Sequence, residues 1–319
     1  MGQHHAAAVQ YSGSKVVGVI DRNVDLARAV ARRYRGAMAS NDLAATMEQA
    51  NPTIAHLCTP ADTHRFLAER LAVAKIHAFI EKPMAGSAAE TREILNVFER
   101  NGARACPVHQ YAFQRSVERA IAVGPWIGTV RRIAFDIRSA GGGDSASGHD
   151  RIAGEIVPHP LSIIQRLLPG IDIGALDWAL QRATPGEWLA SANSNGVLLS
   201  IAISMGGRPT RFVTIVSGTG GTVELDNFHD YGIYLPGAVS RAAKITQPFV
   251  YAGKSLAAAA RNLAERTLRR ESAYPGLRTL TRQFHDAANS SGRIAVPISA
   301  AETIAVAVAR EALLAQCPE

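Results

Sequence analysis

Two short segments carry side chains whose types and spacing suit acid–base chemistry. The first is Glu81-Lys82-Pro83, which directly follows the apolar run His77-Ala78-Phe79-Ile80. A lysine can take up or release a proton once its pKa is lowered, whereas an arginine cannot. Only five of the 34 basic residues are lysines, so a lysine at this point is uncommon. A surface lysine at the start of a helix is the alternative interpretation.

The second segment is Glu155-Ile156-Val157-Pro158-His159-Pro160. Proline is tolerated in the first helical turn, so the two prolines predict a helix that starts near Val157. The partial positive charge of a helix N-terminus favours a neutral His159 that can accept a proton. Glu155 is close enough in sequence to orient this ring or to stabilise its charged form. A structural histidine between two prolines is the alternative.

Residues after two other predicted strands suit the binding of a dinucleotide. Asp21 ends an apolar run, where an acid accepts hydrogen bonds from the adenosine ribose and repels a 2′-phosphate, which favours NAD over NADP. Arg22 softens this preference, because an arginine can hold a phosphate. Thr59-Pro60 and His64 follow the next predicted strand and could border the nicotinamide. Ordinary turn and capping residues explain the same positions equally well.

The elements that must position these residues alternate in the first third of the chain. Short apolar strands followed by amphipathic helices indicate a parallel, doubly wound sheet of the α/β class. The predicted strands are Lys15–Ile20, Thr53–Leu57, His77–Ile80 and Ala103–Val108, and the predicted helices are Val24–Tyr34, Leu43–Ala50, Thr63–Val73 and Ala88–Arg100. Ser87 and Glu90 form a capping box for the last helix, and Gly102 closes it.

Beyond about residue 125 several strands follow one another, which indicates a mostly antiparallel sheet with one covered face. The predicted strands are the alternating stretches at 133–137 and 176–180 and the runs Gly196–Met205, Arg211–Ser217, Gly221–Leu225 and Tyr231–Leu235. Gly141-Gly142-Gly143 predicts a loop, and Ser299 with Glu302 opens a final helix. The boundary between the two predicted domains lies between about residues 109 and 125. We therefore expect a dinucleotide-binding domain over 1–112 and a substrate and oligomerisation domain over 113–319.

Composition limits the class of protein. The 319 residues suit two domains, and 47% hydrophobic with 19% charged residues is ordinary for a soluble protein. No apolar run is long enough to span a membrane, and no secretory signal is recognisable, so we expect a cytoplasmic protein. Three cysteines without metal-like spacing predict free thiols and no metal site. A net charge of +7 raises the possibility of nucleic acid, but the chain has no such motif, so we expect no nucleic-acid partner.

Taken together, these motifs resemble the Gfo/Idh/MocA family, the relatives of glucose–fructose oxidoreductase and inositol dehydrogenase. Glu-Lys-Pro at a strand end is the most specific element of the likeness, which runs over nearly the whole chain. The resemblance implies an N-terminal Rossmann domain, a C-terminal α/β domain with a large open sheet, and NAD(P)-dependent oxidation or reduction of a sugar, polyol or cyclitol hydroxyl. It implies that Lys82, next to Glu81, contacts nicotinamide and substrate, and that His159 is the catalytic acid/base. A homo-oligomer that buries the exposed face of the sheet is also expected.

Three features depart from the family pattern. Glu155 stands where the family usually has Asp, and no arginine directly follows Val108-His109-Gln110-Tyr111. The third is the start of the chain, which resembles only the tail of a Gly-x-Gly-x-x-Gly turn, with Gly2 as its third glycine. A sequence shortened at its start is the explanation we favour, and the pyrophosphate then loses its closest backbone approach, which predicts weak dinucleotide binding. A non-catalytic binding or regulatory protein that has lost the cofactor loop is the alternative function.

Overall fold

A computed structural model describes residues 1–139, 146–237, 240–271, 273–290 and 292–317. The chain forms two compact units, which we call unit 1 (Met1–Val108 with Leu277–Thr303) and unit 2 (His109–Gly276 with Ile304–Glu319). The sequence predicts one domain over 113–319, whereas residues 277–303 pack with unit 1. The predicted loop at Gly141-Gly142-Gly143 lies outside the described residues. No helix in the described ranges is long and apolar enough to span a membrane.

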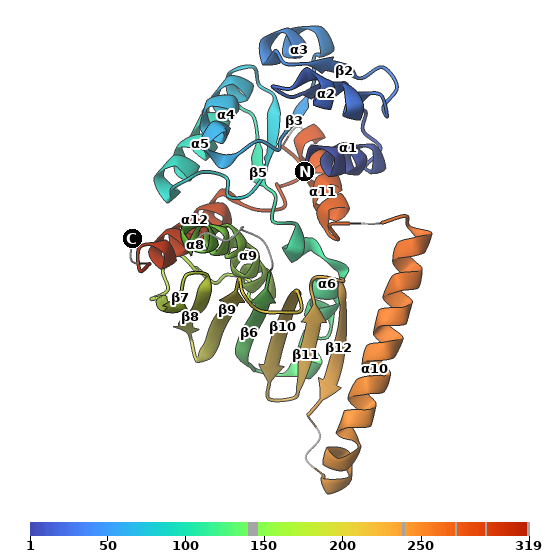
Figure 1. Ribbon diagram of the computed structural model, residues 1–319, viewed down its shortest axis with the longest axis vertical. Helices are drawn as coiled ribbons and strands as arrows, with labels where there is room; N and C mark the ends of the chain where they lie inside the picture. Colours follow the sequence, from blue (N-terminus) through green and yellow to red (C-terminus); the bar gives the residue numbers. More distant parts are fainter. Residues whose placement is uncertain (140–145, 238–239, 272, 291, 318–319) are drawn as a thin grey trace. The chain divides into compact units, whose positions relative to one another are not determined.

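The described residues of unit 1 form five short strands in two separate parallel sheets. The strand β1 (Gly18–Ile20) pairs with β2 (Met38–Ser40), while β4 (His77–Ile80) lies between β3 (Ile54–Leu57) and β5 (Ala105–Pro107). The helices of this unit are α1 (Gly2–Tyr11), α2 (Val24–Ala31), α3 (Leu43–Ala50), α4 (His64–Val73), α5 (Ala88–Arg100) and α11 (Leu277–Asn289) (Figure 1). The alternation of strand and helix therefore gives the parallel Rossmann-like arrangement that the sequence predicts. β1 and β3 each pair on one side only among the described strands.

Local signals define the ends of these elements well. Ser87 Oγ accepts a hydrogen bond from the backbone N–H of Glu90 (3.1 Å), and Gly102 takes a positive φ of 67° after α5. Such caps satisfy N–H and C=O groups that a helix end leaves unpaired. α3 and α5 accordingly begin and end where the sequence predicts, whereas β1 is shorter than predicted and β2 was not predicted.

Unit 2 is built on a seven-stranded sheet in the order β12-β11-β10-β6-β9-β8-β7. Only β6 and β9 are parallel, and every other neighbouring pair is antiparallel. The strands are β6 (Val130–Arg138), β7 (Ala179–Thr184), β8 (Glu187–Ser194), β9 (Val197–Ser204), β10 (Arg211–Gly218), β11 (Gly221–Asp226) and β12 (Tyr231–Pro236). The mostly antiparallel sheet is confirmed, as is the final helix, α12 (Ala300–Leu314), whose capping box joins Ser299 N–H to Glu302 Oε2 (2.8 Å).

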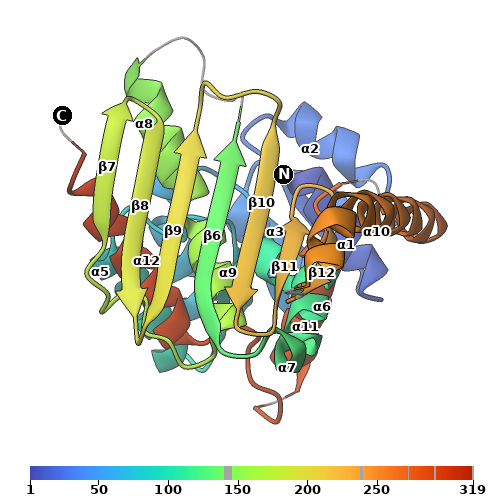
Figure 2. The same cartoon turned by 90° about the horizontal axis from the view of Figure 1, so that it is seen from below.

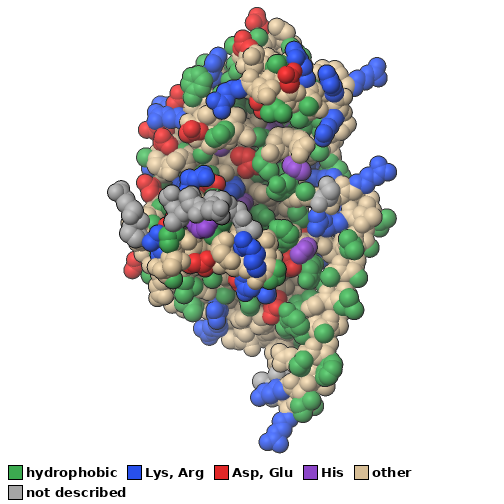
Figure 3. All heavy atoms as spheres, in the orientation of Figure 1, with side chains coloured by type: hydrophobic (Ala, Val, Ile, Leu, Met, Phe, Trp, Pro, Cys, Tyr) green, Lys and Arg blue, Asp and Glu red, His purple; other side chains and the backbone are tan. Residues whose placement is uncertain are grey.

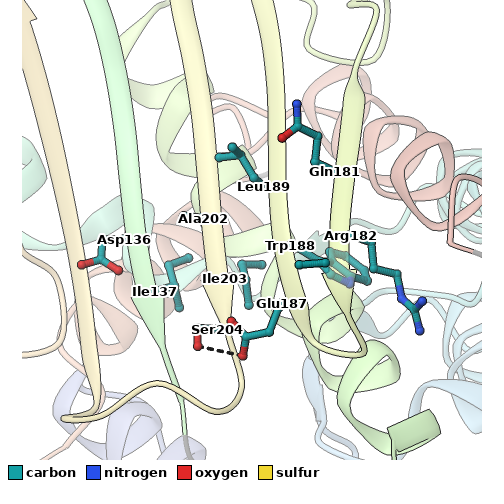
Figure 4. Close-up of a pocket in the computed structure, with 11 residues that line it drawn as sticks. Asp136, Ile137, Gln181, Arg182, Glu187, Trp188, Leu189, Ala202, Ile203 and Ser204 are labelled. Atoms are coloured by element: carbon teal, nitrogen blue, oxygen red, sulfur yellow. Dashed lines mark hydrogen bonds between the residues drawn. The ribbon is translucent and has the colours of Figure 1, made fainter.

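The sheet of unit 2 has one covered and one open face. Its strands alternate, so that residues such as Ile133, Phe135 and Ile201 are almost fully buried while their neighbours face the other way. Figure 2 shows α8 (Ala146–Ile156) and α9 (Pro158–Leu167) behind the sheet and β7, β8, β9 and β6 uncovered toward the viewer. An open hollow on this sheet is bordered by Asp136, Glu187 and Ser204, and the Ser204 hydroxyl donates to Glu187 Oε1 (2.8 Å; Figure 4).

Three expectations for this unit need correction. The predicted strand at 176–180 begins only at Ala179, because the Trp178 indole N–H donates to the carbonyl of Ile173 (2.9 Å) and holds that stretch in a turn. β8 was not predicted, since its inward residues include small alanines that give a weak apolar signal. The helix α10 (Arg241–Leu268) was also missed, because its apolar residues do not lie on a buried face. The remaining helices are α6 (Arg115–Ala122) and α7 (Gly124–Ile127).

Candidate active site

The carboxyl end of β4 fixes the Glu81-Lys82 pair. Ala78, Phe79 and Ile80 are fully buried, and the strand ladder continues with Glu81 N–H donating to Leu57 O (2.9 Å). The Glu81 carboxylate is 7% exposed; its Oε1 contacts His5 Nε2 (2.9 Å), and its Oε2 accepts from the backbone N–H of Lys82 (3.1 Å).

Glu81 keeps its negative charge in this buried position. Burial raises its pKa, but the hydrogen bond and charge of His5, together with Lys82, outweigh burial and hold the pKa below its ordinary value. The backbone of Lys82 is therefore held at the sheet edge by a charged, buried neighbour. His5 carries no sequence signal for this role, since nothing in the local pattern links it to a residue 76 positions away.

Asp21 lies directly after β1 and is exposed. Its backbone N–H donates to Ser40 O (3.1 Å), and its Oδ1 accepts from the backbone N–H of Asn23 (2.8 Å). This carboxylate thus forms a turn and is also open to solvent at a strand end. Arg22 beside it is exposed as well. Both the turn and the ribose interpretations remain compatible with this geometry.

His64 braces two loops that follow neighbouring strands. The ring is almost fully buried, with Nε2 at 2.9 Å from Thr59 O and Nδ1 at 3.1 Å from Met84 O. Thr59-Pro60 is exposed, and the Thr63 hydroxyl donates to Thr59 Oγ1 (2.7 Å). His64 therefore positions the loops after β3 and β4, and the exposed Thr59-Pro60 is the part of this group that a ligand can reach.

Gly2 is the first residue of α1. A side chain at this position would meet no other heavy atom within 4 Å. The first turn of α1 has no acidic residue and no side-chain cap, so its backbone N–H groups are not neutralised by a carboxylate of that turn. Such a helix start suits an anionic group.

His159 lies at the second position of α9 and is 7% exposed. The predicted helix start near Val157 is confirmed. However, α8 ends at Ile156 immediately before it, and hydrogen bonds run across the junction from Val157 N–H to Ala153 O and from Leu161 N–H to Val157 O. The partial positive charge at His159 is consequently smaller than that of an isolated helix start.

Tyr111 packs against His159. It belongs to the 3₁₀ helix η2 (Gln110–Phe113), and its ring meets the imidazole edge to face at a centroid distance of 4.5 Å. Burial raises the pKa of Tyr111 to about 12. One sequence signal points to this segment, because no arginine directly follows Val108-His109-Gln110-Tyr111, where the resembled family usually has one. The next arginine, Arg115, forms ion pairs in unit 2 with Asp230, Glu265 and Glu271, at 3.4, 3.1 and 3.5 Å.

Glu155 lies in the last turn of α8. Its Oε1 accepts a hydrogen bond from Arg151 Nη1 (2.7 Å), and its side chain is 38% exposed. Its charge also affects Arg310. Burial lowers the pKa of the Arg310 guanidinium, and the negative charge of Glu155 offsets part of that lowering. The pairing of Glu155 with His159 remains a prediction.

Comparisons with known proteins match the N-terminal part of the chain to one family. Residues 1–109 match the family model GFO_IDH_MocA, described as "Oxidoreductase family, NAD-binding Rossmann fold". No curated protein matches the sequence closely enough to count as a relative.

Solved structures share the fold over nearly the whole chain. Levoglucosan dehydrogenase, in complex with NADH and levoglucosan, is 15% identical with a TM-score of 0.75, covering 99% of this chain and 94% of that one. GenD2 from gentamicin A biosynthesis, in complex with NAD, is 18% identical with a TM-score of 0.73, covering 99% and 91%. UDP-N-acetylglucosamine 3-dehydrogenase GnnA from Acidithiobacillus ferrooxidans is 17% identical with a TM-score of 0.71, covering 98% and 95%. Residues 1–109 thus match the Gfo/Idh/MocA family of NAD-binding oxidoreductases, and the chain as a whole shares its fold with dehydrogenases of known structure.

Proposed function

We propose that this chain is an NAD(P)-dependent oxidoreductase that moves a hydride between nicotinamide and a hydroxyl-bearing carbon of a sugar, polyol or cyclitol derivative. The observation that carries the proposal is the position of Lys82 at the carboxyl end of β4, where Glu81 fixes its backbone. Ligands of open α/β sheets bind at this edge. By their names, levoglucosan dehydrogenase and UDP-N-acetylglucosamine 3-dehydrogenase act on sugars, which supports the substrate class.

The residues of unit 1 fit a dinucleotide. The exposed Asp21 carboxylate accepts hydrogen bonds of the kind that ribose hydroxyls donate, and the start of α1 at Gly2 offers backbone N–H groups to a pyrophosphate. Thr59-Pro60 is accessible for the nicotinamide end. Asp21 favours NAD, whereas Arg22 can bind the 2′-phosphate of NADP and so weakens that preference. When bound, the cofactor supplies the hydride acceptor at nicotinamide C4.

Two side chains of the chain carry the proton and the charge. The Lys82 ammonium donates a hydrogen bond to the reacting oxygen and stabilises the alkoxide that forms as the C–H bond breaks. His159 takes the hydroxyl proton during oxidation and returns it during reduction. Glu155 stabilises the imidazolium that results. The support for these roles is separate in each unit, namely the sheet edge in unit 1 and the start of α9 in unit 2.

We also propose that the protein is a cytoplasmic homo-oligomer. Its three cysteines are free thiols, as in reducing compartments. The open face of the unit 2 sheet carries Leu189 (42% exposed) and Leu198 (47% exposed) among small and polar residues. Apolar side chains also lie at the surface along α10 (Figure 3). A second copy of the chain would cover both surfaces.

Substitution of Lys82 tests the proposed reaction. A panel of sugars, polyols and cyclitols with NAD and NADP first identifies a substrate by the absorbance of the reduced nicotinamide. Lys82→Met should then lower turnover by roughly a hundredfold or more, because the alkoxide loses its charged donor. Lys82→Arg should also fail, since it keeps the charge but neither the shape nor the titration.

The matched control is Lys75→Met, the same change at an exposed lysine of unit 1. It should leave turnover unchanged, and all three variants should keep the wild-type unfolding temperature. Wild-type turnover in Lys82→Met would remove the assigned role. Cofactor binding with no turnover on any substrate of the panel would favour the non-catalytic alternative.

A further inference from the structure

Three histidines of unit 1 and one carboxylate form an unbroken series of hydrogen bonds. Glu81 Oε1 contacts His5 Nε2 (2.9 Å), and His5 Nδ1 contacts His56 Nδ1 (2.9 Å). His56 Nε2 contacts His285 Nε2 (2.9 Å), and His285 Nδ1 contacts Ser14 Oγ (2.8 Å). His5 and His285 are 2% and 4% exposed, whereas Ser14 is partly exposed. The series therefore runs from solvent to the buried neighbour of Lys82.

Aromatic rings surround the inner part of this series. The Phe79 ring lies 5.8 Å from the His5 ring and 5.0 Å from the His56 ring, and it stacks on Phe284 at 5.3 Å. Across the described ranges no group of three histidine, cysteine or acidic side chains could hold a metal ion. These histidines bond one after another instead of converging on a point, so their arrangement is that of a chain.

The contacts allow two complete hydrogen-bond patterns. When His5 is charged, both of its nitrogens donate, so His56 accepts at Nδ1 and donates from Nε2, and His285 accepts at Nε2 and donates from Nδ1 to Ser14. When His5 is neutral and donates only to Glu81, every later bond reverses, and the Ser14 hydroxyl donates to His285. The two patterns differ by one proton, and no bond of the series is lost in either.

We propose that His5, His56 and His285 are a proton wire between the Glu81 carboxylate and the protein surface at Ser14. A proton from solvent, delivered through Ser14, adds to His285 Nδ1, and the His285 Nε2 proton moves to His56 Nε2. The His56 Nδ1 proton then moves to His5 Nδ1. Two N–H bonds break, three form, and the net change is one proton gained by His5. The reverse sequence releases that proton to solvent.

The charge states of the three rings suit this role. Burial lowers the pKa of His5. Hydrogen bonds to Cys58 and Glu81, together with the charges of these groups, raise it by a larger amount, and the resulting pKa is about 9. Burial lowers the pKa of His56 well below its ordinary value and that of His285 to about 4. The titratable groups packed around the wire are His4 on α1, Cys58 after β3, Glu81 and Lys82 after β4, and Asp286 on α11.

These pKa values define a pH window for the charged pattern. The raised pKa of His5 contributes stability that is complete below the ordinary value of 6.5 and is lost as pH rises through about 9. The depressed pKa of His285 contributes stability that is lost as pH falls from 6.5 towards about 4. In the folded protein His285 is neutral above about pH 4 and His5 is charged below about pH 9, so between these values the charge lies on His5 and the His285 ring is neutral.

Nitrogen NMR of the full chain with ¹⁵N-labelled histidine tests the wire. As His5 loses its charge, at whichever pH this occurs, His56 should change from the Nε2–H to the Nδ1–H tautomer and His285 from Nδ1–H to Nε2–H. His77 is the internal control, because the backbone N–H of Arg104 donates to its Nδ1 (3.0 Å) and fixes its tautomer. If His56 or His285 keeps its tautomer while His5 titrates, there is no wire.

The variant His56→Gln tests whether His5 and His285 are linked through the His56 ring or are merely close to each other. His56→Gln can form hydrogen bonds but cannot pass a proton between two ring nitrogens, so the His285 tautomer should no longer follow His5. A His285 that still follows His5 in this variant would exclude the path through His56.

The role of the wire in turnover depends on the proposed function. There, His56→Gln should lower kcat several-fold with KM unchanged, and added imidazole buffer should restore kcat. Absence of any turnover would count against the proposed function alone, since the NMR result does not depend on it.

Discussion

At the residue scale, the proposed catalytic residues Lys82 and His159 differ in how firmly the carboxylate assigned to each is held. Lys82 follows Glu81, which is buried and tied to His5. His159 is buried beside Tyr111, whereas Glu155 is partly exposed and bonded to Arg151. An exposed ion pair of this kind stabilises a protein by about 0–1 kcal/mol. The ion pair with Arg151 therefore holds the Glu155 carboxylate only weakly.

Substitution of Glu155 tests its assigned effect on His159. Glu155→Gln should lower activity and shift the pH optimum of the step that uses His159, because the imidazolium loses a charged neighbour. Glu155→Asp should be mild, since it restores the residue usual in the family. Arg151→Gln is the control for the salt bridge and should leave the pH profile alone. An unchanged pH–rate profile in Glu155→Gln would show that His159 acts without it.

At the scale of elements, α10 contacts the rest of unit 2 through polar side chains, and several of its apolar side chains are exposed. Tyr251 Oη donates to Glu224 (2.9 Å), Lys254 Nζ donates to the carbonyl of Tyr234 (2.8 Å), and Asn262 Nδ2 donates to that of His229 (2.7 Å). In contrast, Phe249, Leu256 and Leu263 are 78%, 74% and 69% exposed, and they recur every seven residues along one stripe. A helix that turns its apolar stripe outward fits an interface with a second copy.

A charge placed in this stripe should weaken the oligomer. Leu256→Asp would bury an unpaired carboxylate in the interface, which is costly, and should shift the protein to a smaller species in light scattering coupled to gel filtration. Gln247→Asp introduces the same charge at an exposed polar position of α10 and should leave the mass unchanged. A wild-type protein that is already monomeric, or a Leu256→Asp variant of unchanged mass, would remove α10 from the interface.

At the scale of the whole molecule, the parallel strands of unit 1 form two sheets instead of one. β1 and β3 each lack a second partner among the described strands. Each buried backbone group left unpaired costs about 1–3 kcal/mol, against a total stability of about 5–15 kcal/mol.

Calorimetric titration with NAD and NADP tests the consequence for cofactor binding. The chain should bind both weakly, because β1 and β3 pair on one side only among the described strands, which leaves the parallel sheet of unit 1 divided. An added N-terminal segment that encodes a short apolar strand and a Gly-x-Gly turn should raise the unfolding temperature and give NAD-dependent stabilisation. An extension of equal length made of Gly and Ser is the control and should do neither. Micromolar binding without any extension would show that the separate sheets do not limit the cofactor site.

The sequence by itself determined the elements whose signals are local. The caps of α5 and α12 lie within a few residues of the helices they begin, so short-range hydrogen bonding fixes them and a reader of the sequence can find them. The placement of Lys82 at a strand end follows in the same way from the apolar run before it. Only the tertiary structure decided that α11 joins unit 1 and that His5, His56 and His285 meet, across separations of 51 and 229 residues. Such contacts depend on how whole elements pack, and no local pattern records which distant side chains will be brought together.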